Sequence, residues 1–405
     1  MKRLQAFKYK LITNGEQHRK MSGFAGSCRH IYNQAFQLQI ATYEETKKRL
    51  SYPQLCKKLT TWRKDPAKPW LLDVHSQILQ QSLKDLGRAY INFFEGRTSF
   101  PRIKKKGRSV DSFRYPQGCK LEQHNNRIFL PKIGWVRYRN SREVLGVIKN
   151  VTVSSNKGEW FVSIQTQRQV EPPVPTAVKA IGIDVGITRF ATMNDGSYIA
   201  PLNSFKKHQK RLRFYQRRMS RKQKGSKNWK KVVSKVQNTH SNIANARKDY
   251  LHKITTTISK NHALVCIEDL QVQNMSRSSK GNSEQHGKNV KQKSGLNRSI
   301  LDQGWGEFGR QLEYKMEWGG GILIAVPPQY TSQTCPCCNH VSRDNRRKQA
   351  EFLCVECNYQ NHADVVGAIN VLERGYRLLA CGESVPEAVL RSRNPPKRLK
   401  QVKIA

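Results

Sequence analysis

Hydrophobic residues near the amino terminus recur at the spacing of a helix. Between residues 75 and 94 the apolar positions are separated by four and three residues in turn, at Leu79, Leu83, Leu86, Tyr90 and Phe93. This spacing places them on one face of a helix, and we predict that residues 10–96 are largely helical. The remaining faces carry scattered Lys and Arg, which fit either a solvated helical bundle or contact with nucleic acid.

Residues 97–170 follow a different pattern, in which apolar and polar side chains alternate. The alternation is clearest at 127–140 and 150–167, and Asn156, Lys157 and Gly158 have the composition of a hairpin turn. We therefore predict antiparallel strands. The basic segment 100–116 before them mixes Lys and Arg with aromatic residues, which suits either contact with a nucleic-acid strand or a solvated loop.

A Pro-rich segment at 171–177 predicts a linker, after which short apolar runs alternate with helical patterns. We expect strands within 178–200 (with a turn at 194–196), 261–270 and 321–328, and helices within 304–318 and 363–380. Residues 274–298 are polar and rich in Gly, Ser and Lys, which is typical of a mobile loop. We found no internal repeats.

The stretch from Lys206 to Lys248 contains no acidic residue, whereas Lys and Arg recur every two or three positions. Its apolar residues form a thin stripe at helical spacing, made of Leu212, Tyr215, Met219, Val232, Val236 and Ile243. We predict long basic helices here. Because charges of one sign at this density repel one another, we expect these helices to bind phosphate groups rather than to be merely solvated.

Length and charge narrow the class of protein. The chain has 405 residues, 37% of them hydrophobic, which is enough for several domains with cores of their own. Its formal net charge of +44 indicates a polyanionic partner, either nucleic acid or an anionic membrane surface. The sequence shows neither a secretion signal nor an apolar run of about eighteen residues, so we expect no membrane span and a cytoplasmic location.

Four of the ten cysteines have the spacing of a metal site. Cys335 and Cys338, then Cys354 and Cys357, form two Cys-x2-Cys pairs with fifteen residues between them. Four thiolates complete the closed tetrahedral set of structural zinc, so we predict one structural Zn²⁺, with iron as the less favoured alternative. The other cysteines are scattered, which suits a reducing compartment better than a disulfide framework.

Two aspartates lie where a carboxylate could hold a cation. Asp184 ends an apolar run between Gly182 and Gly186, and these glycines let a backbone or a phosphate approach closely. A buried carboxylate is costly unless it is paired or binds a metal, although an aspartate that caps a turn is the simpler alternative. Asp364 precedes an apolar helical pattern, where the simpler alternative is a helix N-cap.

A third carboxylate, Glu268, ends the apolar run of residues 261–270. Its neighbour Asp269 points to the opposite face of a strand, and we choose Glu268 from the alternation of apolar residues along the run. Parallel strands present their carboxyl ends at one crevice. There, two acids and a third from a helix start can hold two divalent cations about 4 Å apart. Carboxylates and water suit Mg²⁺ or Mn²⁺, and such a pair of ions activates water to cleave phosphodiesters.

Together these motifs resemble the TnpB family, which bacterial insertion sequences encode and which is related to the type V CRISPR effectors. The resemblance rests on GIDVG, IEDL, TSQTC with its Cys-x2-Cys pairs and NHADVVGAIN, and it covers most of the chain. It implies a multidomain α+β protein with an RNase H-like (RuvC) α/β nuclease domain and an inserted zinc ribbon. An oligonucleotide-binding-type β-barrel (wedge) containing an inserted helical recognition lobe would precede the nuclease domain.

This resemblance also implies domain boundaries. The parts would be the first wedge strand at 1–9, the recognition lobe at 10–96, the rest of the wedge barrel at 97–170, the RuvC-like domain with basic helices at 171–330, the zinc ribbon at 331–361, the last RuvC helix at 362–382 and a basic, poorly ordered tail at 383–405. The ribbon would then lie immediately before the last helix. We expect it to cover the cleft and to fix the path of the chain into Asp364.

An activity and its partners follow from the same resemblance. Asp184, Glu268 and Asp364 fall on the family's catalytic triad, and the order Asp, Glu, Asp differs from that of the Asp-Asp-Glu transposases, which share the fold. Family members are RNA-guided DNA endonucleases whose guide RNA is transcribed from the transposon end. The implied partners are this RNA and double-stranded target DNA that carries a short adjacent motif.

Five positions line up with family residues that contact the adjacent motif: Tyr52, Ser76, Gln77, Gln80 and, in the barrel, Gln117. Glutamine suits adenine readout in the major groove. One departure from the family concerns Asn339, which follows the first Cys-x2-Cys pair where the family often has glycine. Because Asn also tolerates a left-handed backbone, we expect the zinc site to be retained.

Three other functions remain as alternatives. A non-cleaving RNA-guided repressor would lack one of the three acids, and all three are present. A strand-transfer transposase would join transposon ends without RNA, which the order of the acids disfavours. A zinc-ribbon RNA-binding protein would act without Mg²⁺. We therefore expect a guided DNA nuclease with Mg²⁺ or Mn²⁺ at its acids, in the bacterial cytoplasm and on the nucleoid when bound to DNA.

Overall fold

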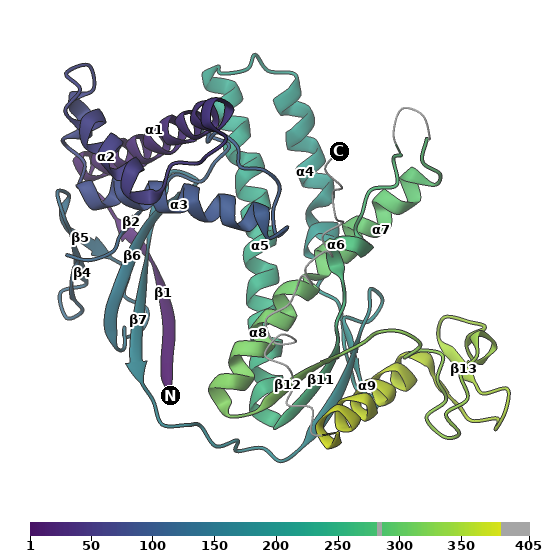
Figure 1. The fold of residues 1–405 in the computed structure, drawn as a ribbon. Coiled ribbons are helices and arrows are strands. Elements are labelled where there is room, and N and C mark those ends of the chain that lie inside the picture. Colours follow the sequence, from purple (N-terminus) through teal and green to yellow (C-terminus); the bar gives the residue numbers. More distant parts are fainter. Residues whose placement is uncertain (282–285, 382–405) are drawn as a thin grey trace. The chain divides into compact units, whose positions relative to one another are not determined.

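A computed structural model describes residues 1–281 and 286–381 of the chain (Figure 1). The chain divides into two compact units, whose described residues are 1–171 and 172–381, so that the division falls within the Pro-rich segment. The basic tail predicted from residue 383 onward lies outside the described residues.

The first unit contains a seven-stranded antiparallel sheet in the order β2-β6-β7-β1-β5-β4-β3. Its strands are β1 (Lys2–Ile12), β2 (Ser112–Tyr115), β3 (Lys120–Glu122), β4 (Arg127–Leu130), β5 (Gly134–Tyr138), β6 (Val147–Asn156) and β7 (Glu159–Gln169). β1 runs past residue 9, where the helical part was predicted to begin, because its last residues Leu11 and Ile12 pair with β5. β2 and β3 are the outer strands of this order, so the closed wedge barrel stays an expectation.

The predicted antiparallel strands in this unit are confirmed. β6 and β7 form a hairpin around Lys157 and Gly158, whose φ angles of 56° and 80° match the two-residue turns that favour such hairpins. Alternate residues of the hairpin are buried, namely Val151, Val153, Trp160, Val162 and Ile164. The period-two pattern of the sequence therefore corresponds to one buried face of the sheet.

Three helices follow β1 and share a core with the sheet: α1 (Gly15–Thr46), α2 (Tyr52–Arg63) and α3 (Ser76–Phe94), with a short 3-10 turn η1 (Pro69–Leu71). Asn14 caps α1, since its side chain accepts a hydrogen bond from the N–H of Gln17 at 2.8 Å. The predicted apolar face of α3 is buried at Leu79, Leu83, Leu86 and Tyr90. These helices therefore form by packing rather than by propensity alone.

The second unit contains a five-stranded mixed sheet in the order β10-β9-β8-β11-β12. β8 (Ala180–Val185), β11 (Leu264–Glu268) and β12 (Ile322–Val326) are parallel. β9 (Ala191–Met193) pairs antiparallel with β8, and β10 (Tyr198–Ile199) pairs antiparallel with β9. The helices are α4 (Ser204–Ser220), α5 (Lys227–Asn261), α6 (Val272–Met275), α7 (Val290–Gln303), α8 (Trp305–Gly319) and α9 (Ala363–Ala380). The strands and helices predicted for this part of the sequence are thus confirmed.

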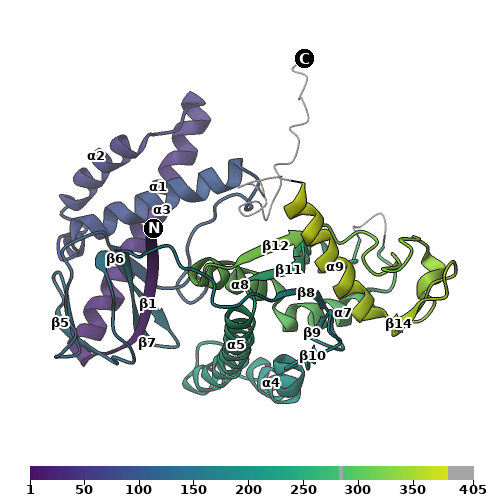
Figure 2. The same ribbon diagram turned by 90° about the horizontal axis from the view of Figure 1, so that it is seen from below.

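Two separate cores cover the two faces of this sheet. Val265 of β11 packs with residues of α5 and α8, whereas Leu264 and Cys266 pack with Val371 of α9. Figure 2 shows α9 alongside β8 and β11. α9 lies so close that a Cβ atom at Gly182 would come within 2.2 Å of the Ala368 carbonyl oxygen. Glycine at this position therefore allows the close contact between α9 and the sheet.

The prediction of a mobile loop at residues 274–298 is wrong for its second part, because α7 begins at Val290. Residues 282–285 lie outside the described residues. Polar contacts hold α7 beside α6: Lys293 Nζ donates to the Met275 carbonyl at 2.8 Å, and Asn297 Nδ2 donates to the Ser276 carbonyl at 3.0 Å. Such tertiary hydrogen bonds leave no periodic apolar pattern in the sequence, which is why the helix was missed.

Asp302 at the end of α7 caps the start of α4. Its carboxylate accepts hydrogen bonds from the N–H groups of Phe205 at 2.9 Å and Lys206 at 3.3 Å, and it is 7% exposed. We expect Asp302→Ala to lower the free energy of unfolding by about 1–3 kcal/mol, because the first backbone N–H groups of α4 lose their buried acceptor. Urea unfolding followed by circular dichroism measures this. Asp249→Ala, at an exposed site on α5, is the matched control and should change stability by less than about 0.5 kcal/mol.

A search of the described helices finds no segment with both the length and the hydropathy of a membrane span.

Candidate active site

The structure brings the three predicted carboxylates to the same side of the second sheet. Asp184 and Glu268 occupy neighbouring parallel strands, one position beyond the register pair Ile183 and Ile267. Asp184 is two residues from Gly182, so by strand alternation its side chain faces α9. Asp364 lies in the first turn of α9. The carboxyl ends of β8 and β11 and the start of α9 therefore meet at one place.

Strand alternation also separates Glu268 from Asp269. Glu268 is in phase with Leu264 and Cys266, which pack against the α9 side of the sheet. Asp269 is out of phase and exposed. The geometry thus favours Glu268 as the carboxylate that accompanies Asp184.

Burial and neighbouring charges shift the pKa values of Asp184 and Glu268. Burial raises the pKa of Asp184 to about 8, and the negative charges of Glu268 and Asp364 act in the same direction. Burial also raises the pKa of Glu268, although a hydrogen bond from Thr331 and the nearby Arg374 and Arg346 oppose the rise. Buried carboxylates of like charge ionise together readily only when a cation lies between them. Hard oxygen donors in this state suit Mg²⁺ or Mn²⁺.

Asp364 is not the N-cap of α9, so the simpler alternative for this residue is wrong. The N-cap is His362, whose Nδ1 accepts a hydrogen bond from the Asp364 N–H at 3.2 Å. The Asp364 side chain instead meets Arg346, whose Nη2 lies 3.4 Å from Oδ1. Arg346 belongs to the 3-10 helix η2 (Arg343–Arg346) between the two cysteine pairs. A run of basic residues is the only signal for Arg346 in the sequence.

The raised pKa of Asp184 predicts how the folding stability of the protein with zinc, but without Mg²⁺ or Mn²⁺, changes with pH. The folded-state pKa of Asp184 lies above its unfolded value near 3.8, so between these values the folded state binds more protons than the unfolded state. Stability must then fall as the pH rises through this window. We expect Asp184→Asn to be more stable than the parent, by on the order of 1 kcal/mol or more at pH 7, and by less at pH 5.

Thermal unfolding of both proteins from pH 5 to pH 8 measures this difference. Asp195→Asn, in the turn between β9 and β10, is the control for loss of one carboxylate. Parallel pH profiles for the parent and Asp184→Asn would contradict the assignment of a raised pKa to Asp184.

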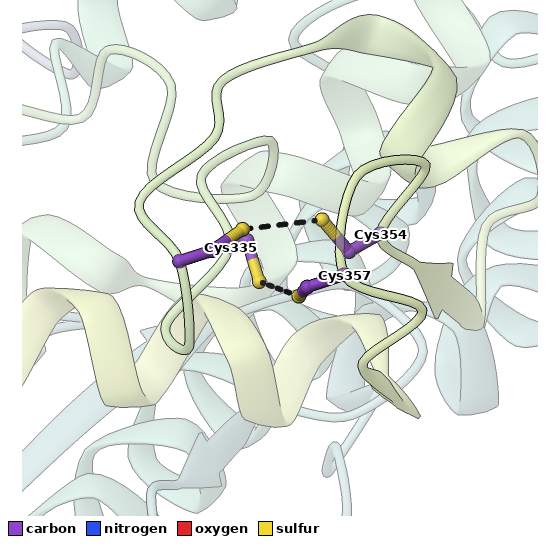
Figure 3. Close-up of side chains that lie close together, drawn as sticks. Cys335, Cys354 and Cys357 are labelled. Atoms are coloured by element: carbon purple, nitrogen blue, oxygen red, sulfur yellow. Dashed lines mark hydrogen bonds between the residues drawn. The ribbon is translucent and has the colours of Figure 1, made fainter.

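The structure brings the four predicted zinc cysteines together. The first pair precedes η2, and the second lies in the connection between two paired strands, β13 (Glu351–Leu353) and β14 (Gln360–His362). Within the described residues, the four cysteines are the only group of three or more metal-ligating side chains close enough to hold one ion. Their Sγ atoms are 3.6 Å apart for Cys335 and Cys357 and 3.5 Å apart for Cys338 and Cys354. Figure 3 shows the sulfur atoms pointing toward one another. Tetrahedral zinc with bonds of about 2.3 Å requires sulfur separations of about 3.8 Å.

Both cysteine pairs end in an asparagine with a left-handed backbone. The φ angles are 62° at Asn339 and 57° at Asn358, so Asn339 replaces glycine without loss of the turn, as predicted. Burial alone would raise the pKa of the Cys354 thiol, but backbone N–H groups of Cys357 and Glu356, with the neighbouring thiols, lower it to about 6. The donor set and its geometry therefore suit structural zinc.

The ribbon shares a small core with the start of α9. Cys335, Cys354 and Phe352 are fully buried together with Ala363 and Val366 of α9. Asp364 lies between those two α9 residues in the sequence. Folding of the ribbon and placement of Asp364 are therefore coupled through packing.

The predicted basic helices are α4 and α5, which pack together as a long hairpin (Figure 1). The apolar stripe is buried at Leu212, Val232, Val236 and Ile243, as expected. Most basic side chains on the other faces are exposed. Aromatic rings lie among them: Arg218 covers Phe214 at 5.5 Å, and Lys235 covers Tyr215 at 5.9 Å. The hairpin thus presents positive charge and aromatic surface together, the combination that single-stranded nucleic acid contacts.

The five residues predicted to contact the adjacent motif all lie in the first unit. Tyr52 begins α2, and Lys84 Nζ of α3 lies 5.3 Å from its ring centre. Ser76, Gln77 and Gln80 are half-buried residues of α3, and Gln117 is exposed between β2 and β3. Their role as motif readers stays a prediction.

Family models match three parts of the chain. A family model described as "Probable transposase" matches residues 163–279, a "Cas12f1-like, TNB domain" model matches residues 305–371, and a "Helix-turn-helix domain" model matches residues 1–48. The last of these covers one strand and a single long helix here. A cryo-EM structure of a Cas12f1–sgRNA–target DNA complex shares the fold, with a TM-score of 0.51, 15% identity, and coverage of 89% of this chain and 83% of the other.

Two full-length relatives are closer in sequence. "Putative RNA-guided DNA endonuclease InsQ" of Escherichia coli strain K12 is 54% identical over 95% of this chain and 96% of its own length. A "Putative RNA-guided DNA endonuclease" of Streptomyces pristinaespiralis is 32% identical over 94% of this chain and 92% of its own length. Similarity at this level over nearly the whole length extends beyond a shared domain. The chain therefore belongs to the TnpB family.

Proposed function

We propose that this chain is an RNA-guided DNA endonuclease that hydrolyses phosphodiesters with two divalent cations. The observation that carries the proposal is the convergence of Asp184, Glu268 and Asp364 on one side of the sheet, where burial and like charge raise the pKa of Asp184. The names of the relatives and the net charge of +44 support it. Two Mg²⁺ or Mn²⁺ ions, rather than one ion shared by all three acids, would be held by these carboxylates, since each offers hard oxygen ligands.

When bound, such cations supply a water nucleophile at neutral pH and stabilise charge on the attacking and leaving oxygens. The chain itself contributes position and charge. The pairing of β8 with β11 sets the distance between Asp184 and Glu268. The core shared by the ribbon and α9 sets the position of Asp364. Arg346 beside Asp364 is placed to donate hydrogen bonds to a phosphate oxygen of the substrate.

The basic hairpin α4–α5 is the proposed surface for guide RNA from the transposon end. Its exposed Lys and Arg neutralise phosphates, and its rings stack on bases. In the first unit, Tyr52, Ser76, Gln77, Gln80 and Gln117 would read the short motif beside double-stranded target DNA. A chain with this function would act in the cytoplasm of a bacterium, on the nucleoid.

A strand-transfer transposase is the second candidate, because the family model that matches residues 163–279 carries that description. The same three acids could support transfer of a DNA 3′ end instead of hydrolysis. This activity would require no RNA, and that difference separates the two candidates.

The test is to express the chain with its native flanking DNA, purify it, and sequence the RNA bound to it. We expect one discrete RNA whose 3′ end runs past the transposon boundary, and Mg²⁺-dependent cutting of a DNA target that matches this end. A random sample of cellular RNA, or joining of transposon ends by RNA-free protein, would overturn the proposal in favour of the transposase. A discrete RNA with target binding but no cutting under any metal condition would favour a non-cleaving repressor.

A further inference from the structure

The loop between β12 and the first cysteine pair contacts Glu268 directly. Thr331 in this loop is 4% exposed, and its Oγ1 lies 2.6 Å from Glu268 Oε1. The hydroxyl is the donor to the ionised carboxylate, because a carboxylate can only accept. A carbonyl oxygen of Pro328 lies farther away, at 3.1 Å, and competes for the same hydrogen. The shorter, charge-assisted bond is the stronger one, so Thr331 fixes one oxygen of Glu268.

Two buried amides hold this loop in turn. Asn370 Nδ2 on α9 donates to the carbonyl oxygens of Thr331 at 2.7 Å and Thr334 at 2.8 Å, which uses both of its hydrogens. Asn345 Nδ2 on η2 donates to the carbonyl oxygen of Gln333 at 2.9 Å. Asn370 and Asn345 are 4% and 1% exposed. Because a buried amide without partners is costly, these bonds clamp the loop between α9 and the ribbon.

Backbone conformation points to the same segment. Tyr330, directly before Thr331, has a φ angle of 59°, in the left-handed region that bulky side chains rarely adopt. Its carbonyl oxygen accepts hydrogen bonds from the N–H groups of Gln333 and Thr334, both at 3.0 Å. Such strain persists where the surrounding contacts determine the conformation, and it is common beside functional groups. The turn at Tyr330 directs the Thr331 side chain toward Glu268.

We infer that Thr331 is a positioning residue for Glu268, held in place by Asn370, and that the zinc ribbon acts on the acidic site through residues 330–335. The inference rests on the proposed function, because it treats Glu268 as a ligand of the divalent cations. Cys335 of the zinc centre follows Thr334 directly, so the first cysteine pair and the Glu268 contact belong to one continuous segment. The ribbon therefore influences two of the three acids: Asp364 through packing and Glu268 through Thr331.

The test compares Thr331→Val, which removes the hydroxyl at nearly constant shape, with Thr331→Ser, which keeps it. For the guide-RNA complex of Thr331→Val, we expect the Mg²⁺ concentration for half-maximal cleavage to rise about tenfold or more, the usual effect of losing a group that orients a metal ligand. Thr331→Ser should restore most of the parent behaviour. Zinc content and target binding should stay at parent values in both variants.

A second readout does not depend on cleavage. Mn²⁺ binding to each complex is followed by electron paramagnetic resonance, and ions held by the RNA are subtracted with the Glu268→Gln complex. We expect Thr331→Val to weaken the Glu268-dependent Mn²⁺ binding and to have no further effect when combined with Glu268→Gln. Thr334→Val is the matched control, because the Thr334 hydroxyl donates to the Tyr330 carbonyl at 2.8 Å rather than to Glu268.

The possible outcomes separate the inference from the function on which it rests. Cleavage by Glu268→Gln at the parent rate would overturn the proposed site itself. An inactive Glu268→Gln together with parent-like metal dependence in Thr331→Val would overturn only the inference. A defect of equal size in Thr331→Ser or Thr334→Val would also overturn the inference. Loss of zinc from Thr331→Val would do the same. Each of these results would mean that the loop matters for folding alone.

Discussion

Asp184→Ala is expected to abolish target cleavage while guide RNA and target DNA remain bound. The carboxylate lies at the end of β8 and faces α9, where burial raises its pKa to about 8. Loss of a cation ligand removes several kcal/mol of transition-state stabilisation, or on the order of 10³-fold or more in rate. We expect binding to depend instead on basic surfaces such as α4 and α5, which the substitution leaves unchanged. Single-turnover cleavage and a gel-shift assay with one labelled target measure the two quantities separately.

Asp269→Ala is the matched control for this experiment. Asp269 follows Glu268 in the sequence but is exposed and out of phase with the face toward α9. The Asp269→Ala variant should cut at the parent rate, whereas Glu268→Ala should be as inactive as Asp184→Ala. Retained cleavage by Asp184→Ala, or equal loss in Asp269→Ala, would refute the assignment of the acidic site.

Cys354→Ser should have the second large effect, because it would remove a buried ligand from the proposed zinc centre. Structural zinc contributes on the order of 10 kcal/mol of folding free energy in small zinc domains, so the ribbon should lose its ion and its packing. Ala363 and Val366 share the ribbon core with Cys354, and Asp364 lies between them. We therefore expect zinc content well below one ion per chain and cleavage reduced by on the order of 10²-fold or more.

The control is Cys337→Ser, which lies between the two cysteines of the first pair, Cys335 and Cys338. Cys337 is exposed and is not one of the four clustered thiols. Its replacement should leave both zinc content and cleavage unchanged. Inductively coupled plasma mass spectrometry gives the zinc content, and circular dichroism of the variants shows whether the two-unit fold persists. Full cleavage by zinc-free Cys354→Ser would show that the ribbon does not position the catalytic acids.

The sequence by itself determined features that depend on local pattern. Period-two alternation gave the β6–β7 hairpin, helical spacing gave the buried face of α3, and cysteine spacing gave the metal cluster. It also placed Asp184, Glu268 and Asp364 at strand ends and a helix start. Each of these signals comes from neighbours within a few residues, where backbone geometry fixes which side chains share a face. The membership in a family followed from the same short motifs.

Only the tertiary structure decided how these parts contact one another. Thr331 and Asn370 belong to the motifs TSQTC and NHADVVGAIN, but the motifs do not reveal that Thr331 contacts Glu268 or that Asn370 holds the loop of residues 330–335. Arg346, which contacts Asp364, lies outside these motifs. The helix α7 was likewise missed, since hydrogen bonds to α6 and burial of Ile300 stabilise a segment with little periodicity. Such contacts join residues that are far apart in the chain. Their free energy comes from burial and from hydrogen bonds to polar groups elsewhere in the sequence. No local pattern records them, so the arrangement around the acids required the folded chain.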